Sequence, residues 1–300
     1  MPVYNGARFI SLAIDSLLSQ TYTDFELIIC DNASTDATYK ICQAYAARDP
    51  RIRLFRNERN RGATYNYRRV FELSRGVYFR YAAHDDMLAP TNIERCVEIL
   101  KREPEIALCY PGMQRIDERG RIIDTFINSL PLREANPVSR WKRFHQLCHD
   151  GSMCDPIFGL FRSSVLRQTA GLGNFISHDM ILLGEIALRG QIYEIPEILF
   201  FERWHPGTSV NANPTLDDRA AWFDPKNRGR LLNYLPQWVW LTRHLNTIAR
   251  VPLNPLQKIA CAAVMLPWMW RNKRGLVLSI AAVTALLLRQ PRIALALRYH

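Results

Sequence analysis

The chain has 300 residues, 48% of them hydrophobic and 22% charged, so it can bury a core, and disorder is excluded as its general state. Seven cysteines are scattered without a Cys-x-x-Cys pair, which excludes a disulfide framework and favours a reducing compartment. The net charge of +11 lies in the C-terminal quarter, where twelve Lys or Arg residues and no Asp or Glu follow Asp224.

Strand and helix patterns alternate along the first two-thirds of the chain. The expected strands cover residues 25–30, 52–55, 77–83, 106–110 and 191–201. The expected helices cover residues 8–19, 36–47, 64–73, 90–101 and 179–189. Ser34 or Thr35 is expected to cap the second helix, and a hairpin is expected around Gly120. This alternation predicts an α/β fold with a doubly wound, mostly parallel sheet.

Acidic side chains follow two of the expected strands. Asp31 comes directly after the first, and Asp85 and Asp86 follow the third. Ligands of such sheets bind beyond the carboxyl ends of the strands, so we expect one shared site. Adjacent carboxylates suit Mg²⁺ or Mn²⁺, which often link a protein carboxylate to a diphosphate. The alternative for an isolated Asp-Asp pair is a solvated turn.

From about residue 220 the composition changes. Two apolar runs, 259–270 and 276–288, are each shorter than the ~20 residues that a membrane-spanning helix needs. Five of the seven tryptophans lie here: Trp222, Trp238, Trp240, Trp268 and Trp270. Tryptophan and basic residues beside apolar helices favour the bilayer interface, and the alternative is a pair of buried helices. No nucleic-acid-binding module is recognisable, so we expect no nucleic-acid partner.

Several segments, in order along the chain, resemble the opening of the family 2 glycosyltransferases. They are Pro2-Val3-Tyr4-Asn5, residues 20–29, residues 31–36, Asn60-Arg61-Gly62, residues 75–78 and residues 85–90. The resemblance covers residues 2–90 well and extends more loosely to about residue 209. It implies a GT-A fold, a nucleotide-sugar donor, a divalent metal ion (Mg²⁺ or Mn²⁺) and inversion at the anomeric carbon.

The resemblance also implies roles for single residues on the donor side. The nucleotide pocket would be lined by Pro2, Val3 and Tyr4, and Asp31 would hold the base or the ribose. Asp85 would be the metal-binding carboxylate of the family's Asp-x-Asp signature, acting with Asp86 or His205. Two positions depart from the family pattern: Ala83 replaces the first acid of that signature, and Ala33 replaces a glycine.

Two further segments resemble functional parts of the family. Asp179 begins an apolar helix and resembles the family's acidic residue on the acceptor side, and an inverting transfer needs one base to take the proton of the acceptor hydroxyl. The alternative role for Asp179 is a helix cap. Arg203-Trp204-His205 looks like the family's Arg-x-His loop near the diphosphate, with Arg203 on phosphate and His205 on metal or phosphate. The alternative here is a solvated loop.

These observations predict a glycosyltransferase domain over residues 1–210 and a helical, basic, Trp-rich, membrane-associating region over residues 211–300. We expect an inverting, hexosyltransferase-type enzyme of surface polysaccharide or glycolipid assembly, with a sugar or lipid-linked sugar as acceptor. No basic segment precedes the first apolar residues, so we expect a cytoplasmic protein, peripheral to the inner face of the cell membrane. The alternative, motivated by Ala83, is a non-catalytic protein of the same fold that acts as a membrane-bound partner.

Overall fold

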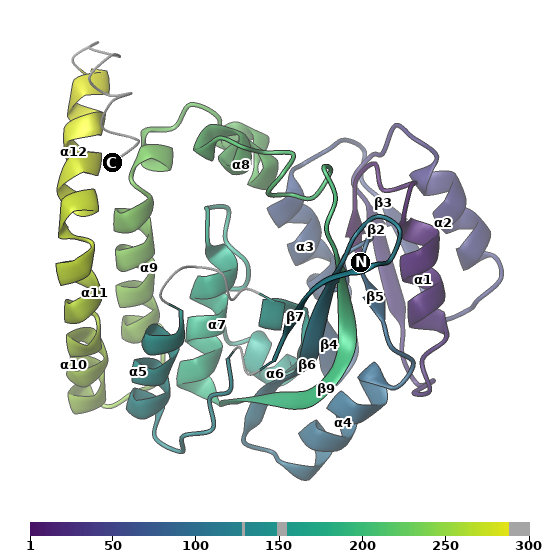
Figure 1. Ribbon diagram of the computed structural model, residues 1–300, viewed down its shortest axis with the longest axis horizontal. Helices are drawn as coiled ribbons and strands as arrows, with labels where there is room; N and C mark the ends of the chain where they lie inside the picture. The colour runs from purple at the N-terminus through teal and green to yellow at the C-terminus, as the bar shows by residue number, and fades with distance from the viewer. Residues whose placement is uncertain (128–129, 149–154, 288–300) are drawn as a thin grey trace.

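The computed structural model describes residues 1–127, 130–148 and 155–287. Its N-terminal part is a three-stranded parallel sheet with short helices beside it (Figure 1). The strands are β1 (Pro2–Val3), β2 (Leu27–Asp31) and β3 (Ile52–Arg56), in that order across the sheet. The helices are α1 (Ile10–Leu18), α2 (Thr38–Ala46) and α3 (Ala63–Glu72). All five residues of β2 are buried, as a strand of a parallel sheet covered on both faces requires.

A second, mixed sheet follows, with the strand order β4-β8-β6-β9-β5, and β7 pairs with β6. Its strands are β4 (Tyr78–Arg80), β5 (Met87–Leu88), β6 (Ile106–Ile116), β7 (Ile122–Phe126), β8 (Leu160–Arg162) and β9 (Gln191–Arg203). Among these strands only the pair β6–β9 is parallel. The helical elements around this sheet are α4 (Asn92–Arg102), α5 (Pro137–Leu147), η1 (Asp155–Phe158), α6 (Ser163–Leu166) and α7 (His178–Arg189).

The structure confirms the α/β class and refines the expected elements. The parallel pairing holds in the N-terminal sheet and between the two longest strands, whereas the short strands of the second sheet run antiparallel to their neighbours. The expected cap of the second helix is wrong. Asp36 Oδ1 accepts the Thr38 N–H at 3.0 Å, and the Ser34 hydroxyl instead accepts the Asn5 N–H at 2.9 Å. The expected hairpin is present as β6–β7, with Gly120 at φ 81° in its turn.

The C-terminal part is helical, as the sequence predicts. Its elements are α8 (Leu216–Phe223), η2 (Pro225–Asn227), η3 (Leu231–Tyr234), α9 (Pro236–Arg250), α10 (Pro255–Val264), α11 (Leu266–Arg271) and α12 (Lys273–Leu287). Asn254 and Gln257 form a reciprocal capping box at the start of α10, which fixes where this helix begins. In Figure 1, α10, α11 and α12 form one column at the edge of the molecule, and α9 separates it from α7. Within the described residues, no helix has both the length and the apolar content needed to cross a bilayer.

The core is continuous across the expected domain boundary at residue 210. Leu182, Leu183 and Ile186 of α7 belong to the same buried cluster as Leu241 of α9 and Met265. The C-terminal helices therefore share a hydrophobic core with the part that carries the second sheet. The division into residues 1–210 and 211–300 stays a prediction about function and surface chemistry.

Candidate active site

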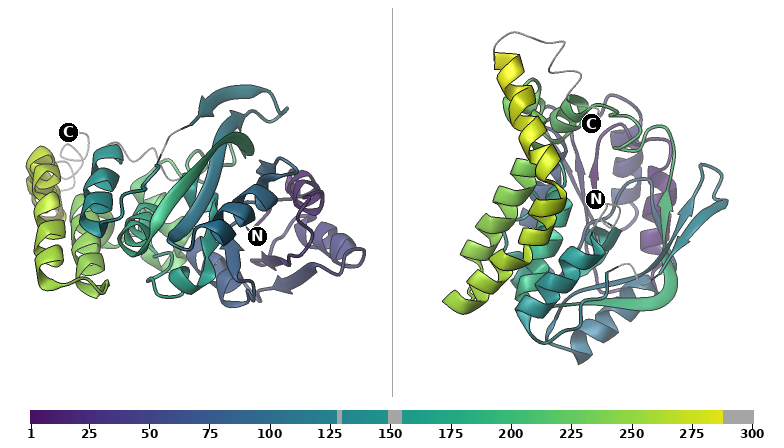
Figure 2. Two further views of the ribbon diagram at one scale, coloured as in Figure 1. Left: turned by 90° about the horizontal axis from the view of Figure 1, so that it is seen from below. Right: turned by 60° about the vertical axis from the view of Figure 1, so that its left-hand side comes forward.

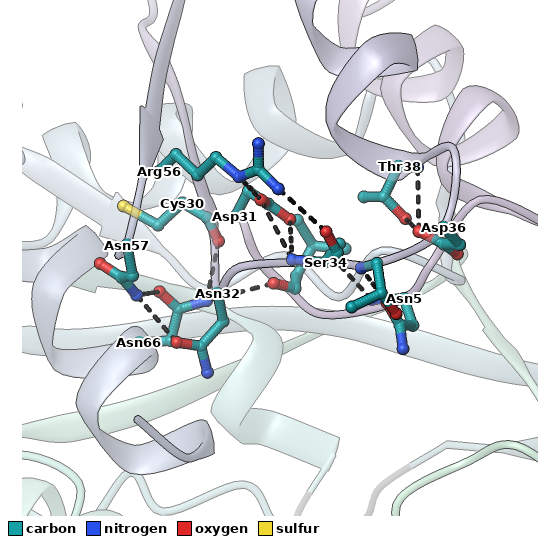
Figure 3. Close-up of polar contacts among 12 residues, drawn as sticks. Asn5, Cys30, Asp31, Asn32, Ser34, Asp36, Thr38, Arg56, Asn57 and Asn66 are labelled. Carbon is teal, nitrogen blue, oxygen red and sulfur yellow. Dashed lines mark hydrogen bonds and ion pairs between the residues drawn. The ribbon is translucent and has the colours of Figure 1, made fainter. Parts of the chain in front are cut away.

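Asp31 lies at the end of β2 as a fully buried carboxylate. Its Oδ2 is 3.0 Å from Arg56 Nε, and both of its oxygens are 3.2 Å from the Ser34 N–H, which donates to them (Figure 3). Asp31 and Arg56 are the last residues of β2 and β3 and lie opposite each other in the sheet. The pairing of these two strands therefore fixes the charge pair. Tyr4, just after β1, is 43% exposed, whereas Pro2 is buried and Val3 packs in the core. Of these three residues, Tyr4 is placed best to contact a ligand.

Four asparagines beside Asp31, Asn32, Asn57, Asn60 and Asn66, form a hydrogen-bonded cluster that sequence reasoning missed, and three of them are labelled in Figure 3. Asn57 Nδ2 donates to Asn32 Oδ1 at 2.9 Å and to Asn66 Oδ1 at 3.1 Å. Asn66 Nδ2 in turn donates to the Cys30 carbonyl at 2.7 Å. The cluster ties β2, the end of β3 and α3 together behind Asp31. Isolated asparagines on three segments give no sequence signal, because the cluster exists only after the segments fold together.

Among the residues that the structure describes, three other than glycine have left-handed backbone, and all lie in loops of the candidate site. They are Asn5 (φ 50°), Ala33 (φ 61°) and Ser177 (φ 64°), which follow β1, follow β2 and precede α7. Ala33 stands where the family commonly has glycine, so the turn keeps its shape at a cost of about 1 kcal/mol. Strained backbone of this kind gathers where a loop geometry serves function, which supports the assignment of this region as a site.

Asp85 and His205 come together across 120 positions of sequence. His205 Nε2 is 3.0 Å from Asp85 Oδ2, and His84 Nδ1 is 3.9 Å from Asp85 Oδ1. Burial acts to raise the pKa of Asp85, but the hydrogen bond from His205 and the two imidazoles together hold that pKa below its usual value. Asp85 is therefore an ionised carboxylate near neutral pH, with an imidazole nitrogen beside it.

Asp86 and Arg203 are buried on the other side of the same turn. Asp86 Oδ1 accepts the Arg203 N–H at 2.9 Å, and burial and then the neighbouring Asp85 charge hold the pKa of Asp86 well above its usual range. The Arg203 guanidinium donates to the carbonyls of Asp85 and Asp117, both at 3.0 Å. The geometry thus favours bracing of the Asp85 turn by Asp86 and Arg203 over direct contact with phosphate or metal.

The loop after β1 connects the Asp31 side to the Asp85 side. At one end Asn5 is bonded to Ser34, as described above. A Cβ on Gly6 would lie 2.3 Å from Cδ2 of His84, so only glycine allows this approach. The Phe9 ring lies 4.8 Å from the His205 ring, centroid to centroid. The two acidic clusters at strand ends therefore meet across one short loop.

Helix α3 positions the segment that carries Asp179. The Thr64 hydroxyl donates to the Gly173 carbonyl at 2.9 Å, and Arg68 Nε donates to the Leu172 carbonyl at 2.6 Å. Asp179 is the second residue of α7, six residues after Gly173, and is half-buried, with Oδ1 accepting the Met180 N–H at 2.8 Å. Its carboxylate thus occupies the first turn of a helix, where negative charge is stabilised.

Tyr67, on the same helix, has a phenol whose pKa responds to several acidic residues of the candidate site. Burial, and next the charges of Asp85 and Asp86, raise the pKa of the Tyr67 phenol above its usual value, and Asp179 adds to the effect. Asp85, Asp86 and Asp179 therefore lie within electrostatic reach of one hydroxyl group. A tyrosine in the middle of an amphipathic helix usually has a packing role, so the sequence pattern alone does not mark Tyr67 as a site residue.

An open groove of about 730 Å³ lies beside His205. One wall is the turn between β6 and β7, and the other is the segment that follows β9. Its lining residues are Asp117, Glu118, Arg119, Arg121, Ile123, Trp204, His205, Pro206 and Asn211. The groove combines one aromatic side chain with charges of both signs, which suits a polyhydroxylated ligand better than an apolar one.

The α/β layers place acidic residues at strand ends and in the first turn of a helix. A family model for glycosyl transferase family 2 matches residues 1–169. The chain belongs to this family, and it is a glycosyltransferase enzyme. Asp179, Arg203 and His205 lie beyond the matched residues, so the match does not test them.

Several curated relatives are glycosyltransferases by name. The chain is 30% identical over 186 residues to chondroitin synthase of Escherichia coli, an alignment that covers 61% of this chain and 25% of that protein. It is 35% identical over 121 residues to the putative glycosyltransferase EpsE of Bacillus subtilis, over 40% of this chain and 44% of that protein. The chain thus spans about a quarter of the length of the first relative and less than half of the second.

Solved structures confirm the GT-A fold. S. aureus TarS in complex with UDP-GlcNAc superposes with a TM-score of 0.63 at 12% identity, over 99% of this chain and 89% of that one. The mannosyltransferase PcManGT of Pyrobaculum calidifontis, in complex with GDP-Man and Mn²⁺, gives a TM-score of 0.52 at 17% identity, over 98% of this chain and 79% of that one. At these identities the likeness concerns the fold alone.

The residues around Asp85 fit a divalent ion bound together with a diphosphate. In the part of the chain that the structure describes, no group of three or more His, Cys, Asp or Glu side chains is arranged to hold a metal. Asp85 and His205 supply two donors, an ionised carboxylate and an imidazole. Mg²⁺ in nucleotide sites commonly takes only one or two protein carboxylates and fills its other positions with phosphate and water. Two protein donors are therefore compatible with such an ion.

Proposed function

We propose that this enzyme transfers a sugar from a nucleotide-sugar donor to a hydroxyl acceptor, with inversion at the anomeric carbon, in the assembly of a surface polysaccharide or glycolipid. The observation that carries the proposal is the Asp85–His205 pair, with Oδ2 and Nε2 3.0 Å apart, in a member of family 2; Asp179 contributes to the raised pKa of the same Tyr67 phenol as Asp85. One relative, chondroitin synthase, and structural neighbours that hold UDP-GlcNAc or GDP-Man support the polymer and the donor class.

The donor side is proposed at the carboxyl ends of β1 and β2. Asp31 holds the base or ribose of the nucleotide, and the strand of Pro2 and Val3 presents Tyr4 to the same pocket. Asp31 is fully buried and held by Arg56 and the Ser34 N–H, so a ligand contacts its carboxylate only after a local rearrangement of these partners. The asparagine cluster behind it keeps the loop in place.

The diphosphate is proposed to lie at Asp85 and His205. These two residues hold a divalent ion, Mg²⁺ or Mn²⁺, and when bound this ion stabilises the charge of the departing nucleoside diphosphate. Asp86 and Arg203 fix the turn that presents Asp85. Arg203 is thereby assigned a positioning role on the donor side, and Asp86 supports the metal ligand next to it.

Asp179 is proposed as the general base. The acceptor oxygen forms a bond to the anomeric carbon while the bond from that carbon to the phosphate oxygen breaks, and the hydroxyl proton moves to the Asp179 carboxylate. The nucleoside diphosphate leaves, and no covalent enzyme intermediate is formed. The groove beside Trp204 is the proposed approach of the acceptor, because a sugar ring can stack on this indole.

Binding of UDP, GDP and dTDP, each with and without Mn²⁺, tests the proposal directly by calorimetry. We expect one nucleoside diphosphate to bind, with an affinity that rises with Mn²⁺, and Asp85→Asn to remove the Mn²⁺ dependence. The matched control Asp24→Asn changes an exposed acid in the same half of the chain and should bind as the parent does. No binding of UDP, GDP or dTDP at millimolar concentration would contradict the proposal.

A further inference from the structure

The helices α10, α11 and α12 have one face packed against the protein. Cys261 and Met265 are fully buried, and the Trp141 indole N–H donates to the Cys261 carbonyl at 3.0 Å. Trp240 and Trp268 stack at 4.1 Å between ring centroids, and the Trp238 indole N–H donates to the carbonyl of residue 276 at 2.9 Å. This face is an ordinary core contact, which fixes the orientation of the three helices.

The opposite face of the same helices carries an apolar stripe, called here the outer stripe. Its members recur at helical spacing and are each between 50% and 78% exposed: Leu256, Ile259, Leu266, Trp270, Val277 and Ile280. The helices run from residue 255 to residue 287, so the stripe follows a column about 50 Å long. Exposed apolar side chains in a continuous row mark an interaction surface, whereas scattered ones do not.

Basic side chains accompany the outer stripe. Lys273 Nζ lies 3.6 Å from the centroid of the Trp270 ring, and Arg274 follows it on the exposed surface. No Asp or Glu occurs anywhere after Asp224. A second copy of this chain docked stripe to stripe would bring basic residues against basic residues. Charge complementarity therefore favours an anionic partner over self-association.

We propose that the outer stripe binds the surface of a bilayer that contains anionic lipids. The apolar side chains enter the boundary between headgroups and acyl chains, to a depth of about 5–10 Å for helices of this type, and the basic residues contact the anionic headgroups. Trp270 suits this boundary because its ring is amphipathic. The helices lie along the surface, since their other face is held by α9 and α5.

This placement has a consequence for the active site. In Figure 1 and in the left view of Figure 2, the column of α10–α12 lies at one end of the molecule and α1 and α2 lie at the other. The bilayer would therefore contact the C-terminal end and leave the N-terminal, Asp31-bearing sheet open to solvent. The surface site recognises anionic lipid by itself, so the inference does not depend on the proposed reaction.

Vesicle flotation of the full chain tests the inference. Vesicles of phosphatidylcholine with about one-third phosphatidylglycerol should carry the protein, and binding should weaken as salt is raised. The triple change Ile259→Glu, Leu266→Glu and Trp270→Glu should lower the partition coefficient at least about a hundredfold, because apolar area is lost and negative charge is added. The double change Lys273→Gln and Arg274→Gln should lower it about thirtyfold on the anionic vesicles, from about fivefold per charge.

Matched control variants carry glutamate on exposed apolar positions far from the outer stripe. Val77→Glu and Leu12→Glu, at positions 73% and 45% exposed, should float as the parent does. Equal thermal midpoints of parent and triple variant establish that folding is intact. The inference is overturned if the parent does not float with anionic vesicles. It is also overturned if the parent sediments as a dimer that the triple change dissociates while flotation stays the same.

Discussion

The N-terminal half and the C-terminal helices differ in the interactions that hold them together. In the first, buried charges and amides are held by strand ends and by backbone in rare conformations, as at Asp31, Ala33 and Asp85. In the second, aromatic packing and an uninterrupted basic character dominate, with Trp240 stacked on Trp268. A reaction site requires particular side chains at fixed positions, whereas the C-terminal helices require only a pattern of apolar and basic residues. The predictions below separate the two regions by what each change affects.

The largest effect is expected from the acids of the active site. Asp179→Asn removes the proposed base and should lower kcat/KM by about 10²–10⁴, and Asp85→Asn should lower it by a similar factor. Neither change should alter the binding to vesicles, because neither side chain belongs to the outer stripe. Steady-state transfer assays with a nucleotide-sugar donor measure this, and a variant that keeps full activity would show the assignment to be wrong.

A smaller loss of activity should follow from a substitution in the loop after β1, which connects the Asp31 side of the site to the Asp85 side. In Gly6→Ala the added Cβ would lie 2.3 Å from Cδ2 of the His84 ring, so the loop or the imidazole must move. We expect kcat/KM to fall up to about a hundredfold, because displacements near 1 Å at a reacting centre have that effect. Unchanged kinetics would show that the loop does not couple the donor side to Asp85.

The stability of the C-terminal helices should depend on pH through His244. His244 is fully buried against Trp240 and Trp141, and burial lowers its pKa to about 3. The folded state keeps this imidazole neutral, whereas the unfolded chain takes up a proton below about pH 6.5. The stability that His244 contributes is therefore complete above about pH 6.5 and is lost as pH falls from there toward about 3.

At about pH 5 this difference amounts to roughly 2 kcal/mol in the free energy of unfolding. Urea denaturation of the parent and of His244→Leu at neutral and acid pH measures it. The variant should lose less stability than the parent over this interval. Parallel pH profiles for the two proteins would contradict the assignment of the buried imidazole.

The smallest effect is expected at Ala33. Replacing it with glycine relieves the left-handed backbone at φ 61° and should raise the free energy of unfolding by up to about 1 kcal/mol, reduced by the greater flexibility of the unfolded chain. Activity should stay near that of the parent, because the loop shape is kept. Destabilisation by this change would mean that the Cβ of Ala33 makes a contact worth more than the strain.

Much of the fold followed from the sequence because buried strands and amphipathic helices have distinct periods. The runs at β2 and β3 and the helix α4 are read directly from residue spacing. The orientation of the short strands β4, β5 and β8 could not be predicted, since two or three residues carry no information on their neighbours. Helix α5 was missed, and its Asn136 cap and Pro137 start are signals that could have revealed it.

The candidate site was predictable where residue type alone limits the chemistry. Asp31, Asp85 and Asp179 stand out as acids at strand ends and at a helix start. The roles of Asp86 and Arg203 were less predictable, because the same side chains can bind ligand or brace a turn, and only the folded contacts favour one. Asn57, Asn66 and Tyr67 depend on segments brought together by α3, so no local pattern marks them.

The central claim is tested most directly by a donor screen that compares the parent with Asp179→Asn. Purified protein with Mn²⁺ is incubated with UDP-, GDP- and dTDP-linked sugars and an oligosaccharide acceptor, and release of nucleoside diphosphate and formation of product are followed together. The account predicts that the parent consumes one donor and transfers its sugar with inverted anomeric configuration, while Asp179→Asn still binds that donor but transfers at least about a hundredfold more slowly. Equal transfer by both proteins, or a product that retains the donor's configuration, would contradict it.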